Sequence, residues 1–247
     1  MKSQLIDLLI YILLFIFVVS LPVDLLRIEL AYELIIRIGL RVILLIFFIY
    51  VIWKNKIKVF GNSTFKELLI FLPFFIICFS NIFATLIGGG FDSVKNSFLV
   101  LFLEILLCLV GAVLEEIVFR LFIQTSLVNR SPLSRIILSA LIFALCHLIN
   151  VVNVRSATAF VNVLIQTVYT FGLGLVLGFI FEYSSSLVFV VILHFAFNLF
   201  NDVLYGFLGG YTTDLVFILT AVVVAMLVAA YGIVLYIKKY RKMERKV

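Results

Sequence analysis

Two adjacent carboxylates, Glu115 and Glu116, lie near the end of an apolar run that begins at Ser97. A carboxylate inside a membrane helix costs about 2.5–3.5 kcal/mol on insertion scales, so an ionisable residue there indicates a functional site. In a helix, Glu116 and Arg120 are four residues apart, share a face and can form an ion pair. Glu115 points about 100° away from Glu116 and stays free to face another group.

The two histidines of the chain, His147 and His194, lie in two further apolar runs. Asn198 follows His194 by four residues and therefore shares its helix face. A carboxylate beside an imidazole can polarise a water molecule and accept its proton, while an imidazole and an amide can donate to a developing oxyanion. This chemistry suffices to hydrolyse an amide bond, and the candidate residues are Glu115, His147, His194 and Asn198.

Other hydrolytic motifs are missing from the sequence. Neither His147 nor His194 belongs to an HExxH zinc helix, and there is no Gly-x-Ser-x-Gly elbow for a serine nucleophile. There is also no glycine-flanked aspartate pair of the intramembrane aspartyl type. The sequence therefore favours activated water over a covalent enzyme intermediate.

The composition predicts that nearly the whole chain lies in a lipid bilayer. Of 247 residues, 65% are hydrophobic and 13% are charged, with a mean hydropathy of +1.31. Soluble domains contain about 45–50% apolar residues. We therefore predict an all-α, polytopic transmembrane helical bundle of about eight spans, forming a single integral membrane domain over residues 1–247. The predicted spans are 5–21, 38–53, 68–87, 97–123, 136–152, 159–181, 187–204 and 215–237.

The distribution of basic residues predicts the orientation of the bundle. With both termini in the cytoplasm, fourteen of the nineteen Lys and Arg residues fall in cytoplasmic segments, including a basic tail over residues 238–247. This asymmetry supports N-in, C-in topology and a multi-pass protein of the cell membrane. Because the basic residues flank apolar runs, the net charge of +6 does not indicate a nucleic-acid partner.

The candidate site residues fall at one depth in the predicted bundle. At 1.5 Å per residue, Glu115, His147 and His194 lie roughly 12–16 Å from the cytoplasmic ends of their spans. The cavity between them should therefore open toward the cytoplasmic half of the membrane.

Several residues around the predicted spans have simpler interpretations. The Gly174-x-x-x-Gly178 pattern predicts close helix packing, and Asn150 should hydrogen-bond between helices. Glu104 lies three turns before Glu115 on the same face; it is either a lone interfacial carboxylate near the outer end or a residue that lines a water path. Asp202 should lie at the outer rim. We expect the segment 24–37 to be a polar, interfacial connection, and the segments 88–92 and 206–214 to be a turn and a loop.

Three motifs occur in a fixed order: Glu115-Glu116-x-x-x-Arg120, Phe143-x-x-x-His147 and His194-x-x-x-Asn198. Together they resemble the CPBP intramembrane protease family, which includes the type II CAAX prenyl endopeptidases and the Abi and bacteriocin-immunity proteins. The resemblance covers roughly residues 98–202, which would form the catalytic core.

The resemblance implies a role for each residue. Glu115 would be the general base, His147 would help to hold the water, and His194 and Asn198 would stabilise the oxyanion. Glu116 and Arg120 would give structural support by fixing the helix ends. The family is often described as metalloproteases, and a mononuclear zinc site needs three protein ligands, which Glu115, His147 and His194 could supply. We favour no tightly bound metal, because Asn198 suits an oxyanion donor better than a zinc ligand.

Three functions remain open at this point. The first is an intramembrane endopeptidase that cleaves a membrane-associated peptide or a lipid-anchored protein, with membrane lipid and that substrate as its partners. The alternative is a non-catalytic membrane protein of bacteriocin self-immunity. A proton-coupled transporter with a relay through Glu104, Glu115 and Asp202 is a third, although no inverted repeat is visible in the hydropathy.

Overall fold

The computed structural model describes residues 2–59, 61, 72–92, 94, 96–153, 156–212, 216, 219–220, 223–224, 226–227, 230–234 and 237–238. These residues form long helices and two short strands. The helices and strands are α1 (Lys2–Val19), η1 (Val23–Leu26), α2 (Leu30–Lys54), α4 (Leu72–Ile77), α5 (Ser80–Gly88), β1 (Gly89–Phe91), α6 (Phe98–Glu116), η3 (Ile117–Gln124), α7 (Pro132–Cys146), η4 (His147–Asn153), α8 (Ala157–Ser184), α9 (Leu187–Asn198), η5 (Leu199–Leu204), α10 (Tyr205–Phe207) and β2 (Gly210–Thr212).

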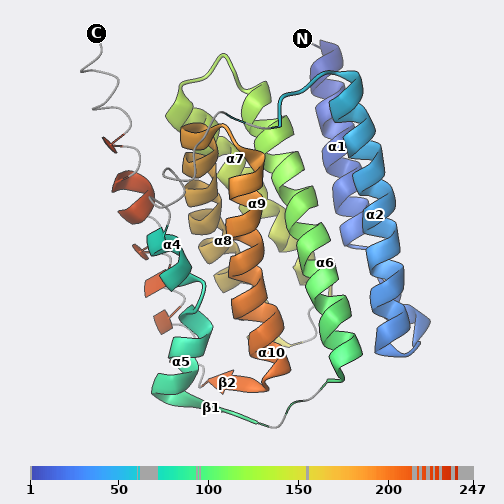
Figure 1. The fold of residues 1–247 in the computed structure, drawn as a ribbon, viewed down its shortest axis with the longest axis vertical. Helices are drawn as coiled ribbons and strands as arrows, with labels where there is room; N and C mark the ends of the chain where they lie inside the picture. The colour runs from blue at the N-terminus through green and yellow to red at the C-terminus, as the bar shows by residue number, and fades with distance from the viewer. Residues whose placement is uncertain are drawn as a thin grey trace.

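The long helices run up and down beside one another, with α6 in the middle (Figure 1). The hairpin of α1 and α2 packs on one side of α6, and α9 packs on it from the other, with α8 between α9 and α7. The start of α1 and the loop before α7 lie at one end of the bundle, while β1, β2 and α10 lie at the opposite end (Figure 1). The outer faces carry many exposed apolar side chains, which suits a lipid environment.

Six described helices are long and apolar enough to cross a membrane: Ile6–Leu26, Leu30–Lys54, Phe98–Gln124, Pro132–Val152, Ala159–Ser184 and Leu187–Phe207. These six confirm the predicted all-α, multi-pass architecture. The predicted spans 68–87 and 215–237, and most of the basic tail 238–247, lie wholly or partly outside the described residues. In the described part of span 68–87, the helix is interrupted at Cys78 and Phe79, between α4 and α5.

The prediction that the segment 24–37 is a polar connection is wrong for its second half, because α2 already begins at Leu30. Arg37 donates through Nε to Glu33 at 2.8 Å, one helical turn earlier, and its Nη2 lies 3.7 Å from the Asp24 carboxylate. Since these charges pair with one another within and beside the helix, they do not end it.

The turn and the loop predicted around residues 88–92 and 206–214 contain two strands. β1 pairs with β2 in antiparallel register, with Gly89 opposite Thr212 and Phe91 opposite Gly210. Three-residue strands rich in glycine carry no alternating apolar pattern, so the sequence offered no signal for them. Their pairing ties the segment before α6 to the segment after α9.

Serine residues fix the starts of three membrane helices. The hydroxyl groups of Ser97, Ser131 and Ser156 accept hydrogen bonds from the backbone N–H groups three residues later, at 3.1–3.3 Å. Pro132 occupies the first position of α7, where its missing N–H costs nothing. These caps fix where α6, α7 and α8 begin, and thus at which depth their polar residues lie.

Gly174 and Gly178 pack α8 closely against α7, as the sequence predicted. A Cβ at Gly174 would lie 3.1 Å from the Cα and Cβ of Ala140 and from Cδ1 of Phe143, and one at Gly178 would lie 3.0 Å from Cγ2 of Ile136. Small residues allow the two backbones to approach, and van der Waals packing then holds the helices together in lipid.

We predict that Gly174→Leu destabilises the protein by about 1–3 kcal/mol, because the added side chain must push α7 and α8 apart. Thermal unfolding of the purified protein in detergent would show a lower midpoint than the wild type. Gly39→Leu is the matched control, since no atom lies within 4 Å of its Cβ position. Equal midpoints for the two variants would contradict close packing at Gly174.

Candidate active site

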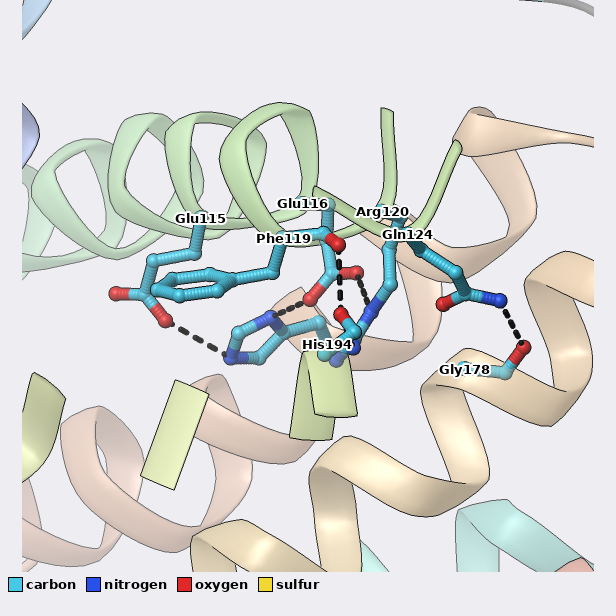
Figure 2. A network of polar contacts seen from close by, with 8 residues as sticks. Glu115, Glu116, Phe119, Arg120, Gln124, Gly178 and His194 are labelled. Atoms are coloured by element: carbon cyan, nitrogen blue, oxygen red, sulfur yellow. Dashed lines mark hydrogen bonds and ion pairs between the residues drawn. The ribbon is translucent and has the colours of Figure 1, made fainter. Parts of the chain in front are cut away.

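Glu116 is buried in the middle of the bundle and forms an ion pair with Arg120. Both side chains have no solvent exposure, and Nε of Arg120 donates to Oε2 of Glu116 at 2.8 Å. The four-residue spacing places both groups on one helix face, as predicted. Glu115, the preceding residue, points elsewhere on α6 and borders a cavity (Figure 2).

His194 of α9 lies between the two carboxylates (Figure 2). Its Nδ1 lies 2.7 Å from Oε1 of Glu116, and its Nε2 lies 3.6 Å from Oε2 of Glu115. A carboxylate can only accept, so Nδ1 carries the proton of the shorter contact. The ring is therefore oriented by Glu116, with Nε2 facing Glu115 and the cavity.

Arg120 extends this network to α7. Its Nη1 donates to the hydroxyl of Ser139 at 3.2 Å, and that hydroxyl donates to the carbonyl oxygen of Phe119 at 2.7 Å. The guanidinium also lies over the ring of Phe143, 5.5 Å from its centroid. The predicted role of Glu116 and Arg120 in fixing helix ends is not what we observe, because the helix continues as η3 to Gln124. Instead, the pair holds His194 and links α6, α7 and α9.

His147 lies within the helical span Pro132–Val152, as predicted, at the point where α7 passes into the 3-10 helix η4. Its Nδ1 lies 2.9 Å from the carbonyl oxygen of Phe143 and donates to it, which leaves Nε2 without the proton and able to accept. The Phe143 ring packs edge-on against both imidazoles, with centroids 4.8 Å from His147 and 5.8 Å from His194. Phe143 thus separates and orients the two histidines.

One cavity of about 240 Å³ brings the predicted site residues together. Glu115, His147, His194 and Asn198 all line it, although they come from three helices far apart in the sequence. Asn150 and Gln166 form part of the wall and are linked by a hydrogen bond of 3.0 Å from the Asn150 amide, as expected of Asn150. The remaining lining residues are Phe15, Val19, Phe119, Phe143, Cys146, Ile149, Tyr169, Thr170, Leu173 and Asp202.

Two residues of the N-terminal hairpin complete this wall. Phe15 and Val19 of α1 line the cavity, and Phe15 packs edge-on against Phe119 with ring centroids 5.7 Å apart. The cavity lining also separates two acidic residues that the sequence analysis singled out. Asp202 lines the cavity, and Glu104 is not among its lining residues.

The cavity extends from the Glu115–His194 contact toward the end of the bundle that carries β1, β2 and α10. Its lining comes from η4, which follows α7, from η5, which precedes α10, and from the far end of α1. With the N-terminus in the cytoplasm, this end would face outward. The predicted N-in orientation and the predicted cytoplasmic opening therefore do not fit this fold together.

The helix of the first motif changes from α to π geometry within the motif, and the helix of the third motif changes directly after it. η3 begins at Ile117, after Glu115 and Glu116, and η5 begins at Leu199, after Asn198. π-Helical turns are rare and occur mostly at functional sites, because the wider turn re-aims neighbouring side chains. Neither segment contains proline or glycine, so these distortions could not be predicted from the residue types.

The metal ligands allowed by the sequence do not assemble into a metal site. Within the described residues, no three His, Cys, Asp or Glu side chains come together in a way that could hold a metal ion. Glu115, His147 and His194 share a cavity, but as arranged they do not fit the three-ligand set of a mononuclear zinc centre.

Residues 96–200 match the family model of Rce1-like type II CAAX prenyl endopeptidases. The matched segment contains all three motifs and the network around Arg120, whereas α1 and α2 lie outside it. No curated protein and no solved structure matches the chain.

We predict that Glu116→Gln and Glu115→Gln differ sharply in stability. Glu116→Gln leaves the buried guanidinium of Arg120 without its counter-charge, which costs about 3–5 kcal/mol. The Glu115 side chain is 18% exposed at the cavity, and its ionic contact with His194 is 3.6 Å long, so Glu115→Gln should be nearly neutral. Thermal unfolding of both purified variants measures the difference, and equal midpoints would disprove the structural role of Glu116.

Proposed function

Because residues 96–200 belong to the Rce1-like family of type II CAAX prenyl endopeptidases, within the CPBP intramembrane proteases, we propose that this multi-pass membrane protein is an intramembrane endopeptidase. Its substrate is a membrane-associated peptide or a lipid-anchored protein. It hydrolyses the peptide bond with a water molecule that Glu115 and His147 activate.

The observation that carries this proposal is the shared cavity. A carboxylate, two imidazoles and an amide from α6, the α7–η4 junction and α9 line one space of about 240 Å³. That space can hold several water molecules, each of which occupies about 30 Å³ in the liquid. Isolated polar side chains in membrane helices would not need to converge, so their convergence favours a chemical role.

Glu115 is the proposed general base. Its carboxylate removes a proton from the water while the water oxygen attacks the carbonyl carbon of the scissile bond. Nε2 of His147 is free to accept a hydrogen bond from the same water, since its Nδ1 already donates to the Phe143 carbonyl. His147 thereby orients the water for attack.

Asn198 and His194 are the proposed oxyanion donors. The side-chain amide of Asn198 donates through Nδ2, and Nε2 of His194 donates when the ring carries both protons. When the tetrahedral intermediate collapses, the C–N bond breaks and the proton held by Glu115 passes to the leaving amine. The products are a carboxylic acid and an amine, and Glu115 returns to its starting state.

Glu116 and Arg120 are positioning residues in this mechanism. Glu116 holds Nδ1 of His194 at 2.7 Å and so aims Nε2 into the cavity. Arg120 supplies the positive charge that keeps Glu116 an acceptor in a buried site. Neither side chain lines the cavity, so neither contacts the proposed substrate.

We predict that Glu115→Ala and His194→Ala abolish processing while the protein still inserts into the membrane. Loss of a general base costs about 10²–10⁴-fold in rate, and Asn198→Ala, which removes one oxyanion donor, should cost about 10²–10³-fold. Membrane peptidomics of cells that carry each variant would reveal an uncleaved precursor. Glu104→Gln is the matched control, because this intramembrane carboxylate does not line the cavity.

Full processing by both Glu115→Ala and His194→Ala would refute the catalytic assignment. Retained protection from a bacteriocin in a Glu115→Gln strain would instead favour a non-catalytic role in self-immunity. In that case the polar network serves only the shape of the protein.

We further predict hydrolysis without a tightly bound metal. Purified protein should contain far less than one zinc ion per chain by elemental analysis, and chelators should leave its activity unchanged. The physical reason is that Glu115, His147 and His194 are not arranged as a three-ligand set. One stoichiometric zinc ion that is required for activity would overturn this prediction.

A further inference from the structure

Asp202 is a second carboxylate at the cavity and has no place in the proposed mechanism. It follows Asn198 by four residues, lies in the π-helical segment η5, and lines the same cavity as Glu115. Its side chain is exposed, and the charges of Glu115 and His194 act on it. Asp202 therefore lies beside the reacting groups while remaining accessible to a ligand.

The carboxylate of Asp202 lacks the close arginine partner that three other carboxylates of the bundle have. Glu33, Glu116 and Glu182 each lie 2.7–2.8 Å from an arginine nitrogen. Within the described part of the chain, Asp202 forms no ion pair and no side-chain hydrogen bond. A carboxylate in a membrane span that has no cation beside it is poorly solvated unless water or a ligand supplies the missing partner.

The electrostatic balance of the site favours a positive ligand. Glu116 is paired with Arg120, and the charge of Arg41 acts on Glu115, whereas no arginine acts on Asp202 within the described residues. No lysine or arginine is among the lining residues of the cavity. A positively charged group that enters it therefore meets the unpaired carboxylate of Asp202 in a medium of low dielectric constant.

The neighbouring Asn201 fixes the backbone that carries Asp202. The Asn201 Oδ1 accepts hydrogen bonds from the Ser80 hydroxyl at 3.0 Å and from the Asn81 backbone N–H at 2.9 Å. The Asn81 amide also donates to the Asn201 carbonyl oxygen at 2.9 Å. These contacts anchor η5 to the start of α5, so the position of Asp202 is preorganised, which favours selective binding.

A second cavity also borders Asp202. It measures about 340 Å³ and shares Tyr169 and Asp202 with the first one. Its other lining residues are Ser80, Asn81, Phe197, Asn201, Tyr205, Thr220 and Val224, which include no basic residue. A long side chain that ends in a cation can therefore pass Asp202 without meeting a like charge.

We propose that Asp202 binds a cationic group of the substrate, a lysine or arginine side chain within about two residues of the scissile bond, and so determines specificity. The distance follows from geometry: Asp202 and Asn198 are one helical turn apart, about 6 Å, while an extended peptide advances about 3.3–3.6 Å per residue. This inference rests on the proposed endopeptidase function, because it locates the scissile carbonyl at Asn198.

Binding can be tested separately from cleavage. The full chain in the Glu115→Gln background, which should not consume a peptide, is placed in nanodiscs of zwitterionic lipid. Two labelled hydrophobic peptides, acetylated and amidated, differ only by lysine or norleucine at one position. We expect the lysine peptide to bind at least about tenfold more tightly, equivalent to about 1.4 kcal/mol.

Adding Asp202→Asn should reduce the ratio of the affinities for the lysine and norleucine peptides to nearly one, while Asp202→Glu should retain the preference for lysine. Adding Glu104→Gln, the matched neutralisation outside the cavity, should leave it unchanged. A norleucine peptide with a free N-terminus distinguishes a terminal ammonium from a side chain. If the lysine preference is absent, or is the same with Asp202 and with asparagine in its place, the inference is wrong.

A cleavage assay separates this inference from the proposed function. The protein with Glu115 intact is given a peptide library in the same nanodiscs, and the products are identified by mass spectrometry. Cleavage that Glu115→Ala abolishes, but that shows no Asp202-dependent preference for basic residues, leaves the function in place and refutes the inference. An Asp202-dependent affinity without any cleavage refutes the endopeptidase and retains the cation site.

Discussion

The buried ion pair between Glu116 and Arg120 is the constraint on which the site depends. Neither charge is exposed, and each is tolerated in the membrane because the other lies 2.8 Å away. His194 and Ser139 complete the pair from α9 and α7. A polar network of this kind has few alternative arrangements in lipid, so it fixes which helices are neighbours and how the imidazole of His194 is turned.

Much of the site could be predicted from the sequence because its signals are local. Four-residue spacings placed Glu116 with Arg120 and His194 with Asn198, and polar residues in apolar runs are conspicuous. The glycines at 174 and 178 indicated the close contact of α8 with α7. These inferences need only the helical period and the cost of charge in lipid.

The rest could not be predicted, because it depends on contacts between distant segments. The contact of His194 with Glu116 joins residues 78 positions apart, and the strand pair β1–β2 joins residues 119 to 123 positions apart. The changes from α to π geometry after Glu116 and Asn198 are a further feature that no sequence pattern indicated.

Helix α1 shapes the cavity through Phe15 and Val19, but it contributes none of the polar residues that line the cavity. The four side chains proposed for catalysis, those of Glu115, His147, His194 and Asn198, all lie in the segment that matches the family. Part of the surface that faces the cavity comes from outside that segment. Exchanges on the inner face of α1 can thus widen or narrow the chamber and leave the polar residues untouched. Related proteins with one hydrolytic core can in this way diverge in what they admit by altering an appended hairpin.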